Sequence, residues 1–187
     1  PARPENVNDT RLATTLNVGP VFVATIEHPM SAFNGLGIDN AVVDVDAQEI
    51  PIMDGSAADF VGMIREAGIK RQDDDRIFVR VDKTIRVEEG DKWAQLEPYS
   101  GFIVDFSIDF HHPVIDATPQ RDQFDAARDD YSDKIAVNRT FGFVSDFDKL
   151  RAMGLIQGGS LQNAVAVDEK GIVNPEGLRN EAKIGRA

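Results

Sequence analysis

The sequence predicts an α+β protein in two halves, and three features support this prediction. Every second residue from 102 to 110 is apolar, which is the period of a β-strand with one buried face. Phe60, Met63 and Ile64 have the i, i+3, i+4 spacing of an amphipathic helix that Gly68 would end. A charged run without apolar residues at 70–76 separates two parts that each mix strands and helices.

The first half is expected to read strand, helix, strand, helix. Residues 21–26 are β-branched and apolar and predict a strand. Pro29 fits the first turn of the following helix because its missing N–H has no partner there, and Gly35 would end that helix early. Residues 40–46 predict a second strand. The second helix follows residues 56–59, which resemble a capping box with Asp in place of Glu.

The second half is expected to contain mostly strands. Short strands are predicted at residues 77–81, 83–88 and 93–96, ahead of the alternating strand at 102–110. The stretch 119–137 is polar with scattered apolar positions, and we predict that it is helical. A short helix at 146–153, closed by Gly154, and a last strand at 164–167 complete the expected elements.

Composition excludes several classes of protein. The 187 residues allow one ordinary domain or two small ones, and a net charge of −12 disfavours a nucleic-acid binder, which would show a basic face. No apolar run approaches the length of a membrane span, and the first residues lack the apolar region of a signal peptide. The absence of Cys removes thiolate zinc sites and Cys nucleophiles, and it fits a cytoplasmic protein.

Two places contain histidine, and each has a functional and a structural interpretation. Glu27 and His28 lie where a strand gives way to a helix, and metal-assisted hydrolases pair a His ligand with a Glu base. The pair lacks the second His of the H-E-x-x-H motif, so a strand-end ion pair is the alternative. His111 and His112 are strand neighbours that point to opposite faces, so we interpret them as a strand end stopped by Pro113.

Eight segments occur in an order that resembles one enzyme family. The most specific are Ile-Pro-Ile-Met-Asp-Gly-Ser-Ala at 50–57 and Arg-Thr-Phe-Gly-Phe at 139–143. The others lie at 10–16, 24–28, 35–40, 90–94, 108–113 and 155–160. Together they resemble the UDP-3-O-acyl-N-acetylglucosamine deacetylases, zinc amidases of lipid A and lipopolysaccharide biosynthesis in Gram-negative bacteria. The resemblance covers nearly the whole chain, from about Pro1 to Glu181.

The resemblance implies a fold and its division. The fold would be a two-layer sandwich of two β-α-α-β halves, incomplete at both ends, with the active site between them. Residues 1–72 would form the first half without its opening strands. Residues 73–187 would form the second half, which includes the insert for a hydrophobic passage and lacks the C-terminal helix.

The resemblance also implies catalytic roles. His28 would be one zinc ligand, and Glu27 would be the general base on the metal-bound water, whose pKa zinc lowers towards neutrality. The hydroxyl of Thr140 would help to hold the oxyanion that develops on the acetamide carbonyl. Asp54 matches an acidic position of the family, and we expect it to support the site from behind the reacting groups.

Further positions of the resemblance concern the substrate, UDP-3-O-acyl-N-acetylglucosamine. Lys92 would contact its UDP part through charge, and Phe110 would stack on uracil. The hydrophobic passage for the acyl chain would be bordered by Leu12, Phe141, Phe143, Gly159, Ser160 and Ala164. From the residues alone, the run Gly158-Gly159-Ser160 either approaches a ligand through its backbone or forms a simple loop.

The chain also departs from the family. The family's other two zinc ligands belong to a His-x-x-x-Asp motif beyond residue 179, and its general-acid His lies further on; this chain has none of the three. Pro29 replaces the usual Leu after the Glu-His pair. We therefore expect an inactive fragment of a deacetylase whose complete form binds Zn²⁺. The alternatives are a non-catalytic protein that binds the nucleotide sugar and acyl chain, or a structural partner in an oligomer.

Overall fold

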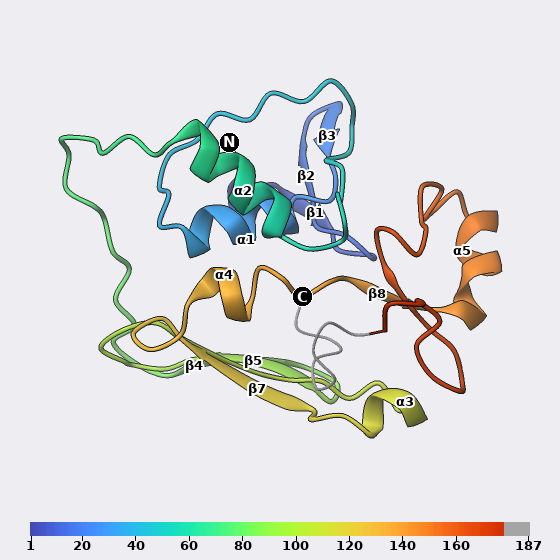
Figure 1. The fold of residues 1–187 in the computed structure, drawn as a ribbon. Coiled ribbons are helices and arrows are strands. Elements are labelled where there is room, and N and C mark those ends of the chain that lie inside the picture. The colour runs from blue at the N-terminus through green and yellow to red at the C-terminus, as the bar shows by residue number, and fades with distance from the viewer. Residues whose placement is uncertain (178–187) are drawn as a thin grey trace.

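The α+β class is confirmed by the computed structural model, which describes residues 1–177 (Figure 1). An antiparallel sheet of order β1-β2-β3 opens the chain. Its strands are β1 (Val7–Asp9), β2 (Thr15–Val18) and β3 (Val21–Val23), and a 3-10 turn, η1 (Pro4–Asn6), precedes them. Gly19 has a φ of +61° in the two-residue turn between β2 and β3, a conformation that glycine adopts readily. The sequence indicated β3 but missed β1 and β2, which are short and partly polar.

Two helices follow and form the main core. They are α1 (Glu27–Gly35) and α2 (Ala58–Ala67). Small side chains allow the two helices to approach closely, and larger ones pack around them. The core consists of Ala32, Ala57, Val61 and Ala136, with Leu36, Phe60, Ile64 and Tyr131 packed against it. The predicted apolar face of α2 is confirmed for Phe60 and Ile64, which pack against the core. Met63, which was predicted to share that face, is 47% exposed, and Val61 is buried instead.

The strand predicted at residues 40–46 is not formed. That segment is irregular, and Val42 is 90% exposed. A strand needs a hydrogen-bonded neighbour along its length, and residues 40–46 have none; the nearest pairing is one parallel bridge just after them, between Ala24 and Glu49. The amide of Ala24 donates to Gln48 O at 2.9 Å, and the amide of Ile50 donates to Ala24 O at 3.1 Å.

Two antiparallel pairs form the next part of the chain. They are β4 (Ile85–Glu89) with β5 (Lys92–Leu96), and β6 (Ile103–Ser107) with β7 (Arg121–Asp125). The strand predicted at 77–81 is absent, and of the helix predicted over 119–137 only a short one at 131–134 is formed. Residues 121–125 pair with β6 instead, and Arg121 forms two 2.7 Å bonds to Asp105 across the pair.

The remaining elements are short. They are α3 (Pro113–Asp116), α4 (Tyr131–Lys134), β8 (Phe141–Phe143), the 3-10 turn η2 (Val144–Asp146), α5 (Phe147–Ala152) and β9 (Val165–Val167). Strands β8 and β9 pair in parallel, and all three residues of β9 are buried. The predictions of a helix at 146–153 and a strand at 164–167 are confirmed within a few residues.

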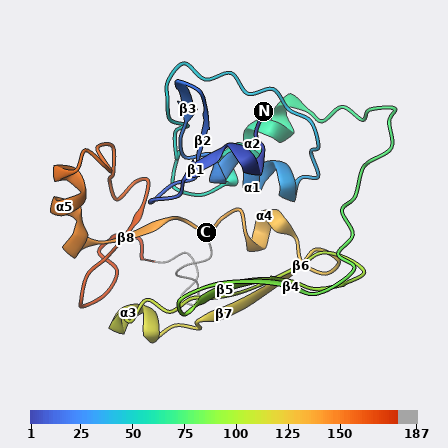
Figure 2. The same cartoon turned by 180° about the vertical axis from the view of Figure 1, so that it is seen from behind.

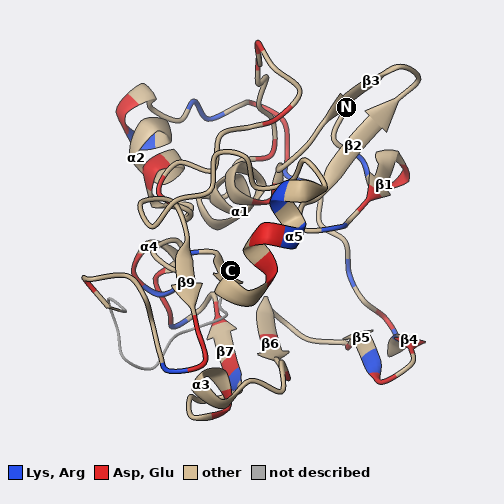
Figure 3. Ribbon diagram, turned by 90° about the vertical axis from the view of Figure 1, so that its right-hand side faces the viewer, with Lys and Arg blue, Asp and Glu red and all other residues tan. Residues whose placement is uncertain are grey.

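The views from front and back place α4 between the N-terminal elements and the β4–β7 strands (Figures 1 and 2). The side view shows the β4–β5 hairpin apart from β6–β7, in agreement with their separate sheets (Figure 3). The sandwich of two layers and the division at residue 72 therefore stay predictions. No helix within residues 1–177 has the length and apolar character needed to cross a bilayer.

Candidate active site

The Glu27–His28 pair occupies the first turn of α1, directly after a sharp change of chain direction. Thr25 has a φ of +61°, which turns the chain out of β3 into the helix. Its hydroxyl donates to Glu49 Oε1 at 2.8 Å, and the Ala24–Glu49 bridge fixes the preceding residue. Left-handed backbone at a β-branched residue is strained and persists only where its surroundings hold it. The structure therefore holds the start of α1 from the side of residues 48–50.

Glu27 is also held from the opposite side. Its Oε2 accepts the backbone N–H of Thr14 at 3.0 Å, a bond that reaches across to the β1–β2 connection. The amide of Ile26 donates to Thr14 O at 3.3 Å, so Thr14 forms two hydrogen bonds with residues at the start of α1. Glu27 is half-buried. One carboxylate oxygen thus anchors the side chain, and Oε1 accepts no hydrogen bond from the residues that the structure describes.

His28 is buried, with 8% of its surface exposed. Burial lowers the pKa of its imidazole below 6.5, and the carboxylates of Glu27 and Asp54 oppose that shift. The ring is therefore neutral at neutral pH, which is the form that binds a metal ion. Asp54 thereby acts electrostatically on His28, although 26 residues separate them in the chain.

Asp54 begins a turn that is almost wholly buried. Its Oδ1 accepts the Ser56 N–H at 2.9 Å and the Ser56 hydroxyl at 2.6 Å, and Ser56 Oγ accepts the Ala58 N–H at 3.1 Å. The N-cap of α2 is Ala57, which makes no side-chain cap hydrogen bond, so the capping box predicted at 56–59 is not formed: Ser56 lies one residue before the cap and bonds to Ala58 instead of Asp59. Gly55, with a φ of +88°, leaves no room for a side chain: a Cβ there would overlap the carbonyl oxygen of Asn163.

Thr140 lies directly on this turn. Its N–H donates to Gly55 O at 2.7 Å, and its carbonyl accepts the N–H of Val165 at 2.9 Å. The neighbouring Arg139 has a nearly buried side chain that donates to the backbone carbonyls of Asp54 and Gln162, each at 2.6 Å, and pairs with Glu176. The structure thus brings Thr140 to the turn whose first residue, Asp54, acts on His28.

Arg139 and Asn174 are structural residues of the site that the sequence analysis assigned no role. Asn174 is 3% exposed, accepts the Ala166 N–H at 2.8 Å, and donates to Leu161 O and Ala164 O at 2.9 and 3.0 Å. Arg139 belongs to the Arg-Thr-Phe-Gly-Phe segment, which the sequence analysis identified. The carbonyl groups to which it donates could not be predicted from the sequence, because they belong to turns far along the chain.

Three of the predicted substrate residues form an aromatic cluster. The ring centroid of Phe110 lies 5.2 Å from that of Phe141 and 6.0 Å from that of Phe143, and both contacts are edge-on. His112 stacks on Phe143 at 4.7 Å and caps α3 by accepting the Val114 N–H. His112 was interpreted only as a strand end, so its place in this cluster was missed.

The other predicted substrate residues are scattered. Gly159, Ser160 and Ala164 lie on one turn, where the Ala164 amide donates to Ser160 O at 3.1 Å. Lys92 opens the exposed strand β5, in a sheet separate from that of β6. Leu12, 64% exposed, lies in the β1–β2 connection. Within residues 1–177, no ring contact or hydrogen bond joins Lys92 or Leu12 to the aromatic cluster.

A catalytic zinc ion takes three protein ligands and keeps one open position. Within residues 1–177, no group of three His, Asp or Glu side chains is arranged to hold a metal ion. His28 fits as one ligand because it is buried, neutral and flanked by carboxylates. The prediction that the chain lacks the family's other two zinc ligands, beyond residue 179, concerns positions outside the described residues.

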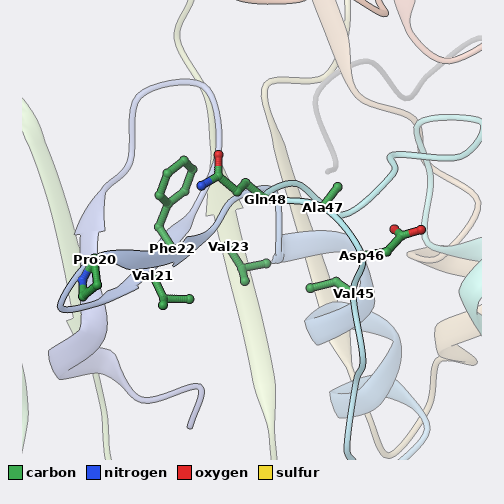
Figure 4. A pocket seen from close by; sticks show the side chains of 8 residues that line it. All are labelled: Pro20, Val21, Phe22, Val23, Val45, Asp46, Ala47 and Gln48. Atoms are coloured by element: carbon green, nitrogen blue, oxygen red, sulfur yellow. The ribbon is translucent and has the colours of Figure 1, made fainter.

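A shallow hollow lies beside the site. It measures about 310 Å³ and is lined by residues 20–23 and 45–48, with Phe22 and Val45 on its walls (Figure 4). None of its lining residues is among the predicted site residues. The hollow therefore lies between β3, with the turn before it, and the irregular segment at 45–48.

The burial of His28 predicts a pH-dependent stability. Its folded pKa lies below the value near 6.5 of the unfolded chain, so below about pH 6.5 the unfolded chain binds more protons and folding loses stability. His28→Asn should make the free energy of unfolding fall less steeply with acid over that range. Urea unfolding at a series of pH values measures this slope. His111→Asn, at an exposed position, should keep the steeper slope, and equal slopes in all three proteins would contradict the prediction.

The sequence is similar to one family of known proteins over nearly its whole length. The family model described as UDP-3-O-acyl N-acetylglycosamine deacetylase matches residues 1–186. Relatives named UDP-3-O-acyl-N-acetylglucosamine deacetylase are 50% identical over 179 residues in Methylococcus capsulatus and 51% over 178 residues in Acidithiobacillus ferrooxidans, covering 96% and 95% of this chain. A Legionella pneumophila relative is 50% identical over 183 residues, or 98% of this chain. The chain spans 59–60% of these relatives' own lengths. The chain belongs to the UDP-3-O-acyl N-acetylglycosamine deacetylase family.

Proposed function

We propose that this chain carries part of the active site of an enzyme that hydrolyses the N-acetyl group of UDP-3-O-acyl-N-acetylglucosamine. The observation that supports this most is the link between the first turn of α1 and the turn that begins at Asp54. Glu27 and His28 lie in that first turn, Asp54 acts on His28, and Thr140 is bonded to the turn that follows Asp54. In this proposal the site lies between a first half of residues 1–72 and a second half of residues 73–187.

Each of these residues has a distinct task in the proposed reaction. Glu27, anchored through Oε2, takes the proton of the attacking water on Oε1. The Thr140 hydroxyl donates to the oxygen that gains charge as the acetamide carbonyl is attacked. Asp54 supports His28 electrostatically and holds the turn through Ser56. His28 is proposed as one of three zinc ligands, and zinc would supply Lewis-acid polarisation of the reacting groups.

The aromatic cluster supports the proposed substrate. Phe110 is 43% exposed, so one part of its ring packs on Phe141 and Phe143 while another is available to stack on uracil. Phe141 and Phe143, with Leu12, Gly159, Ser160 and Ala164, are proposed to border the passage for the acyl chain. Lys92, exposed on β5, is proposed to contact the diphosphate through its charge.

A second candidate function is binding without hydrolysis. The aromatic cluster favours it, because Phe110, Phe141 and Phe143 would hold a nucleotide sugar and an acyl chain whether or not a metal ion is present. Under this alternative the protein would bind the UDP-sugar but release no acetate.

The test compares this chain with a chimera that joins it to the part of the Methylococcus capsulatus sequence that it does not cover. We expect the chimera to hold zinc after dialysis and to release acetate, whereas the chain alone releases little or none. Zinc analysis, acetate release and calorimetry with the UDP-sugar are measured on both proteins. A folded chimera that binds zinc but never deacetylates the UDP-sugar would refute the proposal, and heat of binding without acetate would favour the second candidate.

A further inference from the structure

Tyr131 of α4 lies against α1, although 100 residues separate it from its partner Ser31. The Tyr131 hydroxyl is 2.7 Å from Ser31 Oγ. Its ring lies directly against Gly35, where a Cβ would overlap the ring carbons. Tyr131 is half-buried and belongs to the shell around the main core. The contact is therefore specific in two ways, since it needs a hydroxyl at one position and the absence of a side chain at the other.

These two contacts lie along the side of α1 that begins with the proposed catalytic pair. Ser31 is four residues after Glu27 and three after His28, and Gly35 is four residues after Ser31. Residues three and four apart share a face of a helix. Tyr131 consequently touches the same stripe of α1 one and two turns beyond Glu27 and His28.

The segment that Tyr131 begins also reaches the proposed oxyanion donor. Ala136 O accepts the N–H of Ala57 at 2.9 Å, and Thr140 N–H donates to Gly55 O at 2.7 Å. Residues 131–140 are thus bonded to α1 at one end and to the turn after Asp54 at the other. Within this segment, Tyr131 makes the side-chain hydrogen bond to α1.

A phenylalanine at position 131 would fill nearly the same volume, so the contribution specific to tyrosine is the oriented hydrogen bond of its hydroxyl to Ser31. A hydrogen bond constrains angle as well as distance, whereas apolar packing constrains mainly distance. The start of α1 is held through Thr14 and Glu49, and the Tyr131–Ser31 bond adds a constraint one turn further along the helix. Without that bond a small rotation of α1 about its axis is opposed less, and such a rotation would move Glu27 and His28 relative to Thr140. Small misplacements of reacting groups lower the rate steeply.

We propose that Tyr131, through its bond to Ser31, is a positioning residue that sets the orientation of Glu27 and His28 relative to Thr140. This inference rests on the proposed deacetylase function. It concerns residues that contact neither the reacting amide nor the nucleotide in that proposal.

The kinetic test uses four variants of the chimera defined above. Tyr131→Phe and Ser31→Ala should each lower kcat by about 3- to 10-fold, with KM unchanged. The double variant should match either single variant, because all three lack the same bond. Tyr99→Phe, which changes the chain's other tyrosine at an exposed position, should keep the parent kcat. A residue with a merely structural role would lower the free energy of unfolding and leave kcat of the folded enzyme unchanged.

A second readout does not need activity. NMR of the three histidine rings of this chain, assigned with His28→Asn, should show a shift of the His28 resonances in Tyr131→Phe and in Ser31→Ala, with His111 unmoved. Unchanged kcat in an active chimera, or unchanged His28 resonances in either variant, overturns the inference. If the parent chimera folds and holds zinc but releases no acetate, the proposed function is wrong, and the His28 resonances alone then decide whether Tyr131 positions α1.

Discussion

Glu27→Gln should reduce kcat for acetate release by the chimera by about 10²- to 10⁴-fold, the usual contribution of a general base. The reason is that an amide cannot take the proton of the attacking water. Gln keeps the shape of the side chain, and its Oε1 can still accept the Thr14 N–H that Glu27 accepts at 3.0 Å. The fold and KM should therefore stay close to those of the parent protein. Acetate release over a range of substrate concentrations gives kcat and KM, and urea unfolding checks the fold.

The matched control is Glu66→Gln. Glu66 is exposed on α2, and its replacement by Gln removes one negative charge from residues 1–72, as Glu27→Gln does. Its kcat should equal that of the parent within about twofold, which is less than 0.5 kcal/mol of barrier. Equal losses in Glu27→Gln and Glu66→Gln would show that net charge, and not the position of the carboxylate, controls the rate.

Gly55→Ala should lower the free energy of unfolding by about 3 kcal/mol, because two costs combine at one residue. The φ of +88° is strained for any residue with a Cβ. The new methyl group would also overlap the backbone carbonyl of Asn163 and lie 3.2 Å from Thr140 Cγ2. A backbone atom cannot move aside as a flexible side chain can, so the turn beneath Thr140 must shift. Urea denaturation of the chain measures the change.

Gly62→Ala is the opposite control. Gly62 lies within α2, and a Cβ there meets no atom within 4 Å. Alanine in a helix interior is favoured over glycine, so this variant should raise the free energy of unfolding by about 0.5–1 kcal/mol. A loss of stability in Gly62→Ala, or no loss in Gly55→Ala, would contradict the account of the turn at Gly55.

Local pattern was enough to predict some elements. The alternation at 102–110 predicted a strand, and β6 (Ile103–Ser107) lies within it. The helix at Phe60 and Ile64 ends at Gly68, whose φ of +83° is one that glycine adopts easily. In these segments the spacing of apolar residues two to four positions apart was enough to predict the secondary structure.

Other elements depended on a partner far along the chain. Residues 40–46 are as apolar and β-branched as a strand should be, yet they have no neighbouring strand to pair with. Residues 121–125 are polar, yet they form β7 because β6 offers a partner and Asp105 pairs with Arg121. Propensity is a weak indicator wherever such pairing decides the outcome.

The candidate site divides in the same way. The Glu27–His28 pair was visible as a dipeptide at the junction of a strand and a helix, and both residues lie in the first turn of α1. The family segments pointed to Asp54 and Thr140 as well. The effect of the Asp54 carboxylate on the pKa of His28 and the hydrogen bond from Arg139 to Asp54 O could not be predicted from spacing, because these residues are 26 and 85 positions apart in the chain.

By itself the sequence determined the α+β class, the family, and the residue types available for chemistry. These follow from short-range periodicity and from motifs a few residues long, which carry their information locally. Only the tertiary structure decided that Thr140 lies on the turn after Asp54 and that Tyr131 bonds to Ser31 along the stripe of Glu27 and His28. Such contacts join residues about 85 to 100 positions apart, and they depend on the path of the chain and on which surfaces are small enough to meet.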